Sequence, residues 1–235
     1  MTWDVLRKYA GINIDGRRKL DAGNVSEYSL SPEAKESLKK RFIIAVEFET
    51  ESIEAYNQVV LGKMEELESE LGIKFYLAGR DYPVHVTILE GMDEQKDPKE
   101  DKMNTEKVFD LVDGDERIAN VRKQLTGIIV ELKYPLLNAG NLLMSAVDIP
   151  PKVLQAREDL SEIYSSYGLR PLPIHNILHS TACRMEKFPD DAQTMNMIFR
   201  RYMEVVKEIR AITSKSPIQM KVGDVYSGNT HDLLY

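Results

Sequence analysis

Two short stretches decide how this chain folds: Val84-His85-Val86-Thr87-Ile88 and Leu178-His179-Ser180-Thr181-Ala182. Each sets a His-x-Thr tripeptide between apolar residues, and such alternation is typical of a β-strand. Side chains two places apart in a strand point to the same face, so the histidine and threonine of each stretch share a face. If the strands meet, two imidazoles and two hydroxyls come together. The alternative is two unrelated strands with ordinary half-buried histidines.

The composition bounds the class of protein. The 235 residues are 43% hydrophobic and 29% charged, with a formal net charge of −7, which suits a soluble protein of one large domain or two intimate lobes. An extended nucleic-acid coat needs a basic surface, so we expect a small nucleotide or an RNA end as the partner instead. Nothing in the sequence indicates the oligomeric state.

The expected location is the cytoplasm. The single cysteine, Cys183, rules out an intramolecular disulfide and suits a reducing compartment. The N-terminal residues lack the apolar run of a signal peptide, and no stretch approaches the ~18 apolar residues of a membrane span. We therefore expect no membrane partner.

Two segments are predicted to lie outside the main fold. Residues 1–41 have too little apolar content for a core of their own and are predicted to be an N-terminal extension, with a short helix that begins at Ser31. Its basic cluster Arg17-Arg18-Lys19 could make it a phosphate-binding lid, or could be a solvated charge run. Residues 92–104 are predicted to be a charged, solvated insertion.

The remaining predicted elements occur twice in the same order. An apolar run at 41–48 predicts a strand, and helical spacing then predicts a helix that ends at Gly72 before the first His-x-Thr strand. A hairpin over 128–148 and a helix from Pro151 to Gly168 precede the second His-x-Thr strand. An internal duplication explains this order. The other predicted elements are short helices around 108–112 and 118–125, a long helix after Pro189 and a strand at about 218–226.

We therefore predict an α+β fold of two duplicated lobes, with antiparallel sheets around a central cleft and helices on the outside. The domain is predicted to cover residues 42–235, with halves of about 42–127 and 128–235. A quasi-twofold axis between the halves would bring the two His-x-Thr strands together in the shared cleft.

Two imidazoles and two hydroxyls suit phosphodiester chemistry. Imidazole has an ordinary pKa near 6.5, so one histidine can take a proton from the attacking water or hydroxyl while the other gives one to the leaving oxygen. The threonine hydroxyls can donate to the non-bridging oxygens. Because the repeat is nearly symmetric, the sequence leaves open whether His85 or His179 is the acid.

Paired motifs of this kind in a duplicated α+β chain resemble the 2H (two-histidine) phosphoesterase superfamily. Its members include 2′-5′ RNA ligase-like proteins, 2′,3′-cyclic nucleotide phosphodiesterases and 2′-5′ oligoadenylate phosphodiesterases. The resemblance covers about residues 42–226, and small Ala182 after the second motif is a mild departure. It implies that no metal or cofactor takes part. The residues it implies are the catalytic pair His85 and His179 and the phosphate ligands Thr87 and Thr181.

The activity implied by this resemblance is a phosphodiesterase that acts on a 2′,3′-cyclic phosphate or a 2′-5′ linkage of a nucleotide or RNA end. Two alternatives stay open: a non-catalytic module that binds a nucleotide or RNA end, and an RNA 2′-5′ ligase. The sequence does not identify the substrate.

Six further residues are weighed as candidates. Arg80 and Arg184 flank the two motifs and could bind a further phosphate or form surface ion pairs, and Tyr226 and His231 could contact a base or ribose. His175 is four residues before His179, but the neighbouring prolines argue against the helix that a zinc pair would need. Cys183 continues the alternation of the second motif and could face the cleft, although a buried inert thiol is the default.

Overall fold

The structure is a computed structural model that describes residues 38, 41–92, 105–138, 141–172, 177–185 and 192–234. The predicted helix of the N-terminal extension, its basic cluster, residues 93–104 of the predicted insertion, His175 and Pro189 lie outside the described residues. No helix among the described residues combines the length and apolar character needed to cross a membrane.

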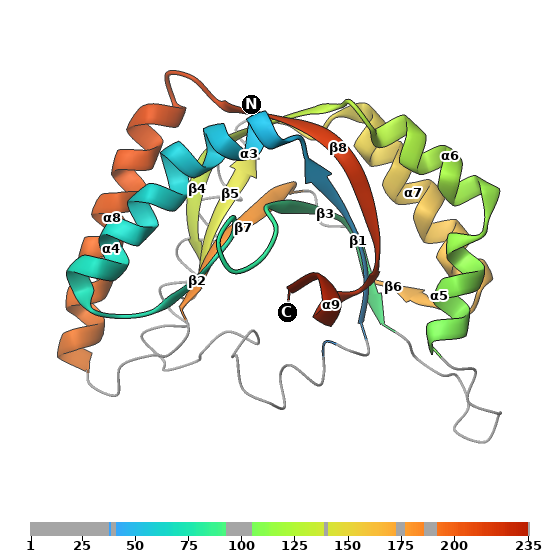
Figure 1. Cartoon of the computed structure of the whole chain (residues 1–235), viewed down its shortest axis with the longest axis horizontal. Coiled ribbons are helices and arrows are strands. Elements are labelled where there is room, and N and C mark those ends of the chain that lie inside the picture. The colour runs from blue at the N-terminus through green and yellow to red at the C-terminus, as the bar shows by residue number, and fades with distance from the viewer. Residues whose placement is uncertain are drawn as a thin grey trace.

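The described chain forms an eight-stranded sheet with antiparallel strand pairs and helices packed around it, which confirms the predicted α+β class (Figure 1). In sheet order the strands are β2 (Phe75–Leu77), β7 (His179–Met185), β5 (Asn141–Ala146), β4 (Ile129–Asn138), β8 (Ile218–Asn229), β1 (Arg41–Phe48), β3 (His85–Met92) and β6 (Arg170–Pro171). The helices are α3 (Thr50–Tyr56), the π-helical segment η1 (Asn57–Leu61), α4 (Gly62–Leu71), α5 (Thr105–Asp113), α6 (Glu116–Leu125), α7 (Pro151–Ser166), α8 (Ala192–Thr213) and α9 (Thr230–Leu234).

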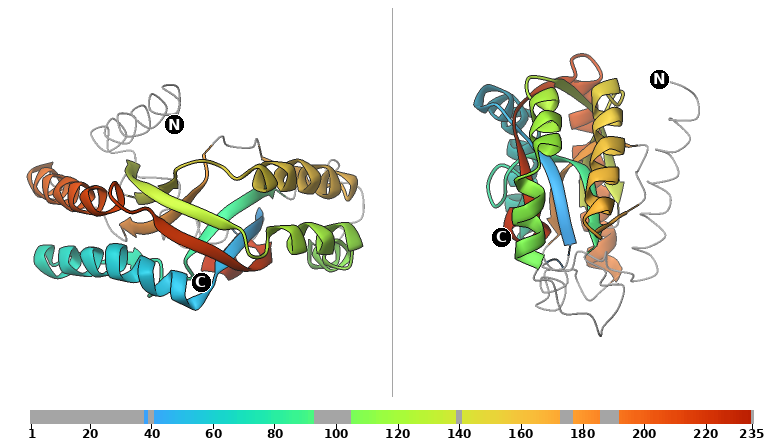
Figure 2. Two further views of the ribbon diagram at one scale, coloured as in Figure 1. Left: turned by 90° about the horizontal axis from the view of Figure 1, so that it is seen from above. Right: turned by 90° about the vertical axis from the view of Figure 1, so that its right-hand side faces the viewer.

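Apart from α9, which contacts β1 and β8, the helices form two groups at opposite ends of the sheet (Figures 1 and 2). Helices α4 and α8 pack together, against β2 and β4 respectively, and α7 packs on β3 and β6 beside α6. Strand β8 links the two ends, because its residues 218–221 pair with β4 and its residues 222–229 pair with β1. It extends three residues beyond the predicted strand, and α9, which was not predicted, follows it directly.

The sheet exchanges its edge strands between the two predicted halves. Strands β1 and β3 pair with each other across α3 and α4, and β5 and β7 pair across α7. However, β2 precedes β3 in the chain and pairs with β7, while β6 precedes β7 and pairs with β3. Strand β2, which leads to the first His-x-Thr strand, therefore lies beside the second one, and β6, which leads to the second, lies beside the first. The boundaries of the two halves stay a prediction.

The main core lies between the sheet and the helices. Phe42 of β1 stacks on Tyr164 of α7 with ring centroids 4.7 Å apart, and Phe75 of β2 meets Tyr202 of α8 at 5.7 Å. Burying a large apolar side chain contributes about 1.5–3 kcal/mol, so these contacts fix both helix groups on the sheet. As predicted, α4 and α7 are followed by glycines in the left-handed region, Gly72 (φ +62°) and Gly168 (φ +82°).

Candidate functional site

Strand register places the first motif on the sheet face opposite to the main core. Val86 pairs with a residue of β1, and both belong to the core under the helices. His85 and Thr87 flank Val86 and therefore point to the opposite face. His85 is nevertheless buried, whereas Thr87 is partly exposed.

The second motif has the same arrangement in β7. Ser180 is fully buried, while His179 and Thr181 are partly exposed and alternate with it. His179 pairs with Ser145 of β5 and Thr181 pairs with Leu143, so the two motif residues share one face. The expectation that histidine and threonine of each motif lie on one face is confirmed.

The two motif strands lie close together in space although they are not neighbours in the sheet order. Tyr82, just ahead of β3, donates its hydroxyl to the carbonyl oxygen of Thr181 at 2.8 Å. The Tyr82 ring also meets His85 edge-on, with centroids 6.0 Å apart. The segment that enters the first motif is thus bonded to the second.

A β-bulge follows the threonine in both motifs. In β3, Thr87 and Leu89 pair with consecutive residues of β1, so the residue between them is extra. In β7, Thr181 and Cys183 pair with consecutive residues of β5, and again one residue is extra. A bulge shifts the alternation of side chains by one residue. The residues beyond it therefore point to faces opposite to those that strict alternation predicts.

The bulge in β7 sends Cys183 into the core. Its sulfur lies 2.6 Å from the Tyr202 hydroxyl of α8, and both residues are buried. Burial raises the pKa of the Cys183 thiol to about 12. The interpretation that Cys183 faces the cleft is wrong, because alternation from Thr181 breaks at the bulge. The expectation of a buried thiol is confirmed, and its inertness stays a prediction.

The same bulge turns Arg184 to the face of the second motif. Arg184 pairs with Tyr76 of β2, whose ring stacks on Tyr82 with centroids 5.1 Å apart. The guanidinium carbon of Arg184 lies 5.1 Å from the centre of the Tyr82 ring, and the residue is 7% exposed. Its charge is close enough to help lower the pKa of His85. A buried cation therefore stands beside the motifs, and its role in phosphate binding stays a prediction.

The environment of His85 fixes its protonation. Its Nδ1 lies 2.9 Å from the carbonyl oxygen of Pro83. A carbonyl only accepts, so Nδ1 carries the hydrogen, and in the neutral ring Nε2 has the free lone pair. Burial lowers the pKa of His85 to about 4; the Pro83 bond opposes this shift and the charge of Arg184 adds to it. At neutral pH His85 is an uncharged imidazole whose Nε2 carries a lone pair.

Arg80 bonds to residues of the first half of the chain. Its guanidinium bonds to the carboxylates of Glu68 and Asp81 and donates to the carbonyl oxygen of Phe75 at 2.8 Å. Hydrogen bonds to the two carboxylates raise the pKa of Arg80 above its ordinary value. These contacts match the ion-pair alternative, and binding of a further phosphate by Arg80 stays a prediction.

The other two candidates lie near the C-terminal end of β8. Tyr226 pairs with Ala45 of β1, which places it on the face of the first motif, and its hydroxyl donates to the carbonyl oxygen of Asn229 at 3.2 Å. His231 lies in α9 with Nδ1 3.2 Å from Oδ1 of Asp232. The structure thus gathers His85, Thr87 and Tyr226 on one face, while contacts of a base or ribose with Tyr226 and His231 stay predictions.

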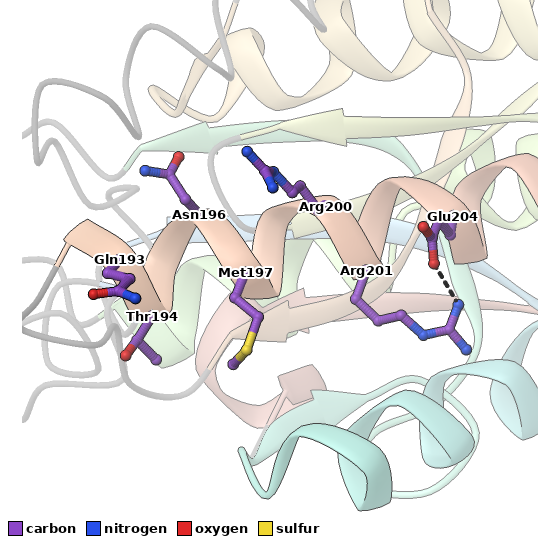
Figure 3. Close-up of a pocket in the computed structure, with 7 residues that line it drawn as sticks. All are labelled: Gln193, Thr194, Asn196, Met197, Arg200, Arg201 and Glu204. Carbon is purple, nitrogen blue, oxygen red and sulfur yellow. Dashed lines mark hydrogen bonds and ion pairs between the residues drawn. The ribbon is translucent and has the colours of Figure 1, made fainter.

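A cavity of about 830 Å³ lies elsewhere, over the first turns of α8 (Figure 3). Asn196, Met197 and Arg200 are among the residues that line it, and none of the predicted site residues does. In the described part of the chain, no group of three or more His, Cys, Asp or Glu side chains could hold a metal ion.

Two residues at the motifs were missed by the sequence reasoning. Tyr82 carries no signal except its place three residues before His85. Arg157 has a clear one, because it interrupts the apolar stripe of α7 that runs from Val153 to Tyr164 and is itself buried. A charged residue on an apolar helical stripe is rarely buried without partners.

A comparison with solved structures finds several that are similar to this chain. A conserved protein of unknown function from Agrobacterium tumefaciens has 9% identity and a TM-score of 0.49, covering 83% of this chain and 85% of that one. Usb1 of Kluyveromyces marxianus, solved with uridine monophosphate, has 12% identity and a TM-score of 0.45, with coverage of 82% and 95%. The ns2 PDE domain of MHV has 18% identity and a TM-score of 0.39, with coverage of 63% and 86%.

No protein-family model matches the chain, and no curated protein matches it either.

Proposed function

We propose that this chain is a metal-independent phosphodiesterase that opens a 2′,3′-cyclic phosphate or cleaves a 2′-5′ linkage of a nucleotide or RNA end. The observation that carries the proposal is the placement of two His-x-Thr motifs, each with its histidine and threonine on one face, on two strands that lie close together, with the buried cation Arg184 beside them. This set supplies a base, an acid and phosphate ligands from the chain's own side chains.

His85 is the proposed base. Its buried ring is uncharged at neutral pH, and the bond of Nδ1 to the Pro83 carbonyl leaves Nε2 free to accept a proton. In the proposed step Nε2 takes the proton of the attacking water or hydroxyl as its oxygen bonds to phosphorus. Arg184 disfavours a second positive charge here, so the imidazolium returns its proton readily.

His179 is the proposed acid, because the base role is filled and its ring is the other imidazole of the pair. It gives a proton to the ribose oxygen as the bond from that oxygen to phosphorus breaks. With water as the nucleophile, a cyclic phosphate becomes a monoester with one free hydroxyl, and the two histidines exchange protonation states. Proton exchange with solvent then restores the starting protonation states of both histidines.

The threonines and Arg184 are the proposed ligands of the phosphate. The Thr87 and Thr181 hydroxyls lie on the faces of their histidines, so they can donate to the non-bridging oxygens that gain charge in the transition state. Arg184 adds a guanidinium that can hold two oxygens at once. Removing one such donor typically costs about 10²–10³ in rate.

The test is hydrolysis of a panel in the presence of EDTA: 2′,3′-cyclic nucleotides, 2′-5′ and 3′-5′ linked dinucleotides, and ADP-ribose cyclic phosphate. His85→Ala and His179→Ala should each lose about 10²–10⁴ in kcat on every substrate that the native protein turns over. The control is Arg200→Ala, an exposed residue of the α8 cavity, which should keep native turnover.

Other outcomes separate the alternatives. Tight binding of panel compounds without turnover would identify a binding module, and joining of RNA ends would identify a ligase. Loss of turnover in Arg200→Ala with retention in both histidine variants would move the site to the α8 cavity.

A further inference from the structure

Arg157 is a buried cation whose bonds reach both motif strands. It lies in the middle of α7, is 4% exposed, and its Nε donates to the carbonyl oxygen of Ile88 at 2.9 Å. Its Nη2 lies 3.3 Å from the carbonyl oxygen of Thr87 and 3.4 Å from that of Ile177. Thr87 and Ile88 belong to the first motif strand, and Ile177 is two residues ahead of His179. One guanidinium therefore joins the bulge of β3 to the entry of β7.

The Ile88 carbonyl needs a donor because of where the bulge puts it. Ile88 is the extra residue of the β3 bulge and has no partner opposite it in β1. On its other side β3 pairs with β6 at Gly91 and Met92, beyond the bulge. A buried carbonyl without a donor is costly, and the planar fork of an arginine can serve several acceptors at fixed angles, which a lysine ammonium does not do.

Burying the charged guanidinium of Arg157 carries a free-energy penalty. Burial lowers the pKa of Arg157 below its ordinary value, since it disfavours the charged form. The neighbouring stripe positions of α7 are apolar, among them Val153 and Leu160, so a leucine would fit the pattern. The backbone carbonyl groups that Arg157 bonds to explain why a charged residue stands at this position.

We propose that Arg157 is a positioning residue that sets the arrangement of the two motifs relative to each other. Its hold on the Thr87 and Ile88 carbonyls fixes the peptide planes that aim the Thr87 hydroxyl, and its hold on Ile177 fixes the entry of the strand that carries His179. The effect on catalysis rests on the proposed function. A misplacement of reacting groups by about 1 Å can lower a rate about 10²-fold.

The test uses Arg157→Lys, which keeps the charge and loses the fork, with Tyr164→Phe as the matched control. Tyr164 is a buried residue of α7 two turns further on, and its hydroxyl bonds at 2.8 Å to Ser227 of β8, which belongs to neither motif strand. In hydrolysis of 2′,3′-cyclic AMP, Arg157→Lys should lower kcat about 10- to 100-fold and change KM less than 3-fold. Tyr164→Phe should keep kcat within 3-fold of native.

A second measurement does not depend on turnover. Backbone amide chemical shifts of ¹⁵N-labelled protein should move in Arg157→Lys at Thr87, Ile88 and His179, and the same resonances should stay in place in Tyr164→Phe. Unchanged motif resonances, or equal losses of kcat in the two variants, would overturn the positioning role. If the native protein turns over no panel compound, the proposed function fails, and the shifts alone decide whether Arg157 joins the motifs.

Discussion

Acidification from pH 7 to pH 4 should cost the folded protein about 3 kcal/mol through His85 alone. The His85 ring is 5% exposed, and burial lowers its pKa from 6.5 to about 4. The unfolded chain exposes the same imidazole to water and restores its ordinary pKa. Each pKa unit corresponds to 1.36 kcal/mol, so the difference of about 2.5 units gives about 3 kcal/mol.

The sign follows from which state takes up the proton. Between pH 6.5 and pH 4 the unfolded chain binds a proton at His85 and the folded protein does not, so falling pH favours unfolding. The stability that His85 contributes by this difference is fully present above pH 6.5 and is lost as the pH falls through the folded pKa near 4.

The assay is urea unfolding, followed by circular dichroism, of the native protein and of His85→Gln at intervals from pH 7.5 to pH 4. Carboxylates titrate in both proteins, so the difference between the two curves isolates the imidazole. The native protein should lose about 3 kcal/mol more of its unfolding free energy than the variant does. Parallel curves, or an NMR titration that gives His85 a midpoint near 6.5, would refute the reasoning.

Three further predictions concern the scaffold of the site. Tyr82→Phe removes the 2.8 Å bond to the Thr181 carbonyl and should lower the unfolding free energy in urea by about 1 kcal/mol; an unchanged midpoint would show that this bond contributes nothing. Cys183 is buried with a pKa raised to about 12, so a disulfide reagent at pH 8 should label it no faster than the protein unfolds, and rapid labelling would contradict its place in the core. Gly91→Ala would put a Cβ 2.1 Å from the Phe42 ring and 2.6 Å from the Arg170 carbonyl oxygen, so thermal unfolding should show a loss of about 1–3 kcal/mol; a loss below about 0.5 kcal/mol would mean that β1 and β6 shift freely.

Much of the fold is readable from apolar spacing. The strand predicted at 41–48 is β1, and the helices closed by Gly72 and Gly168 are α4 and α7. These elements obey local rules, since a buried strand or an amphipathic helix must show its period in its own residues. The π-helical segment η1 and the five-residue α9 have no such local signature.

Contacts between segments far apart in the sequence determine the features that local patterns do not predict. Nothing in Ile88 or Ala182 marks a bulge, because the extra residue is defined by pairing with β1 or β5, far away in the chain. The consequence was an incorrect face for Cys183. The exchange of β2 and β6 between the motif strands is equally invisible to a local pattern.

The symmetry of the two motifs also breaks in three dimensions. In sequence His85 and His179 are alike, so acid and base were interchangeable. In the fold His85 is buried beside Arg184 and bonded to Pro83, while His179 is partly exposed. Burial, which no single-sequence pattern reports for an individual histidine, is what distinguishes them.

The most direct test of the two-histidine mechanism is the pH dependence of kcat/KM, with EDTA present, for the native protein and for each histidine variant. This profile reports the pKa values of the groups of the free enzyme. We predict an acid limb near pH 4 that belongs to His85, survives in His179→Ala and is absent from His85→Ala. An acid limb that survives in His85→Ala, or turnover that neither substitution lowers, would contradict the assignment of His85 as the base and His179 as the acid.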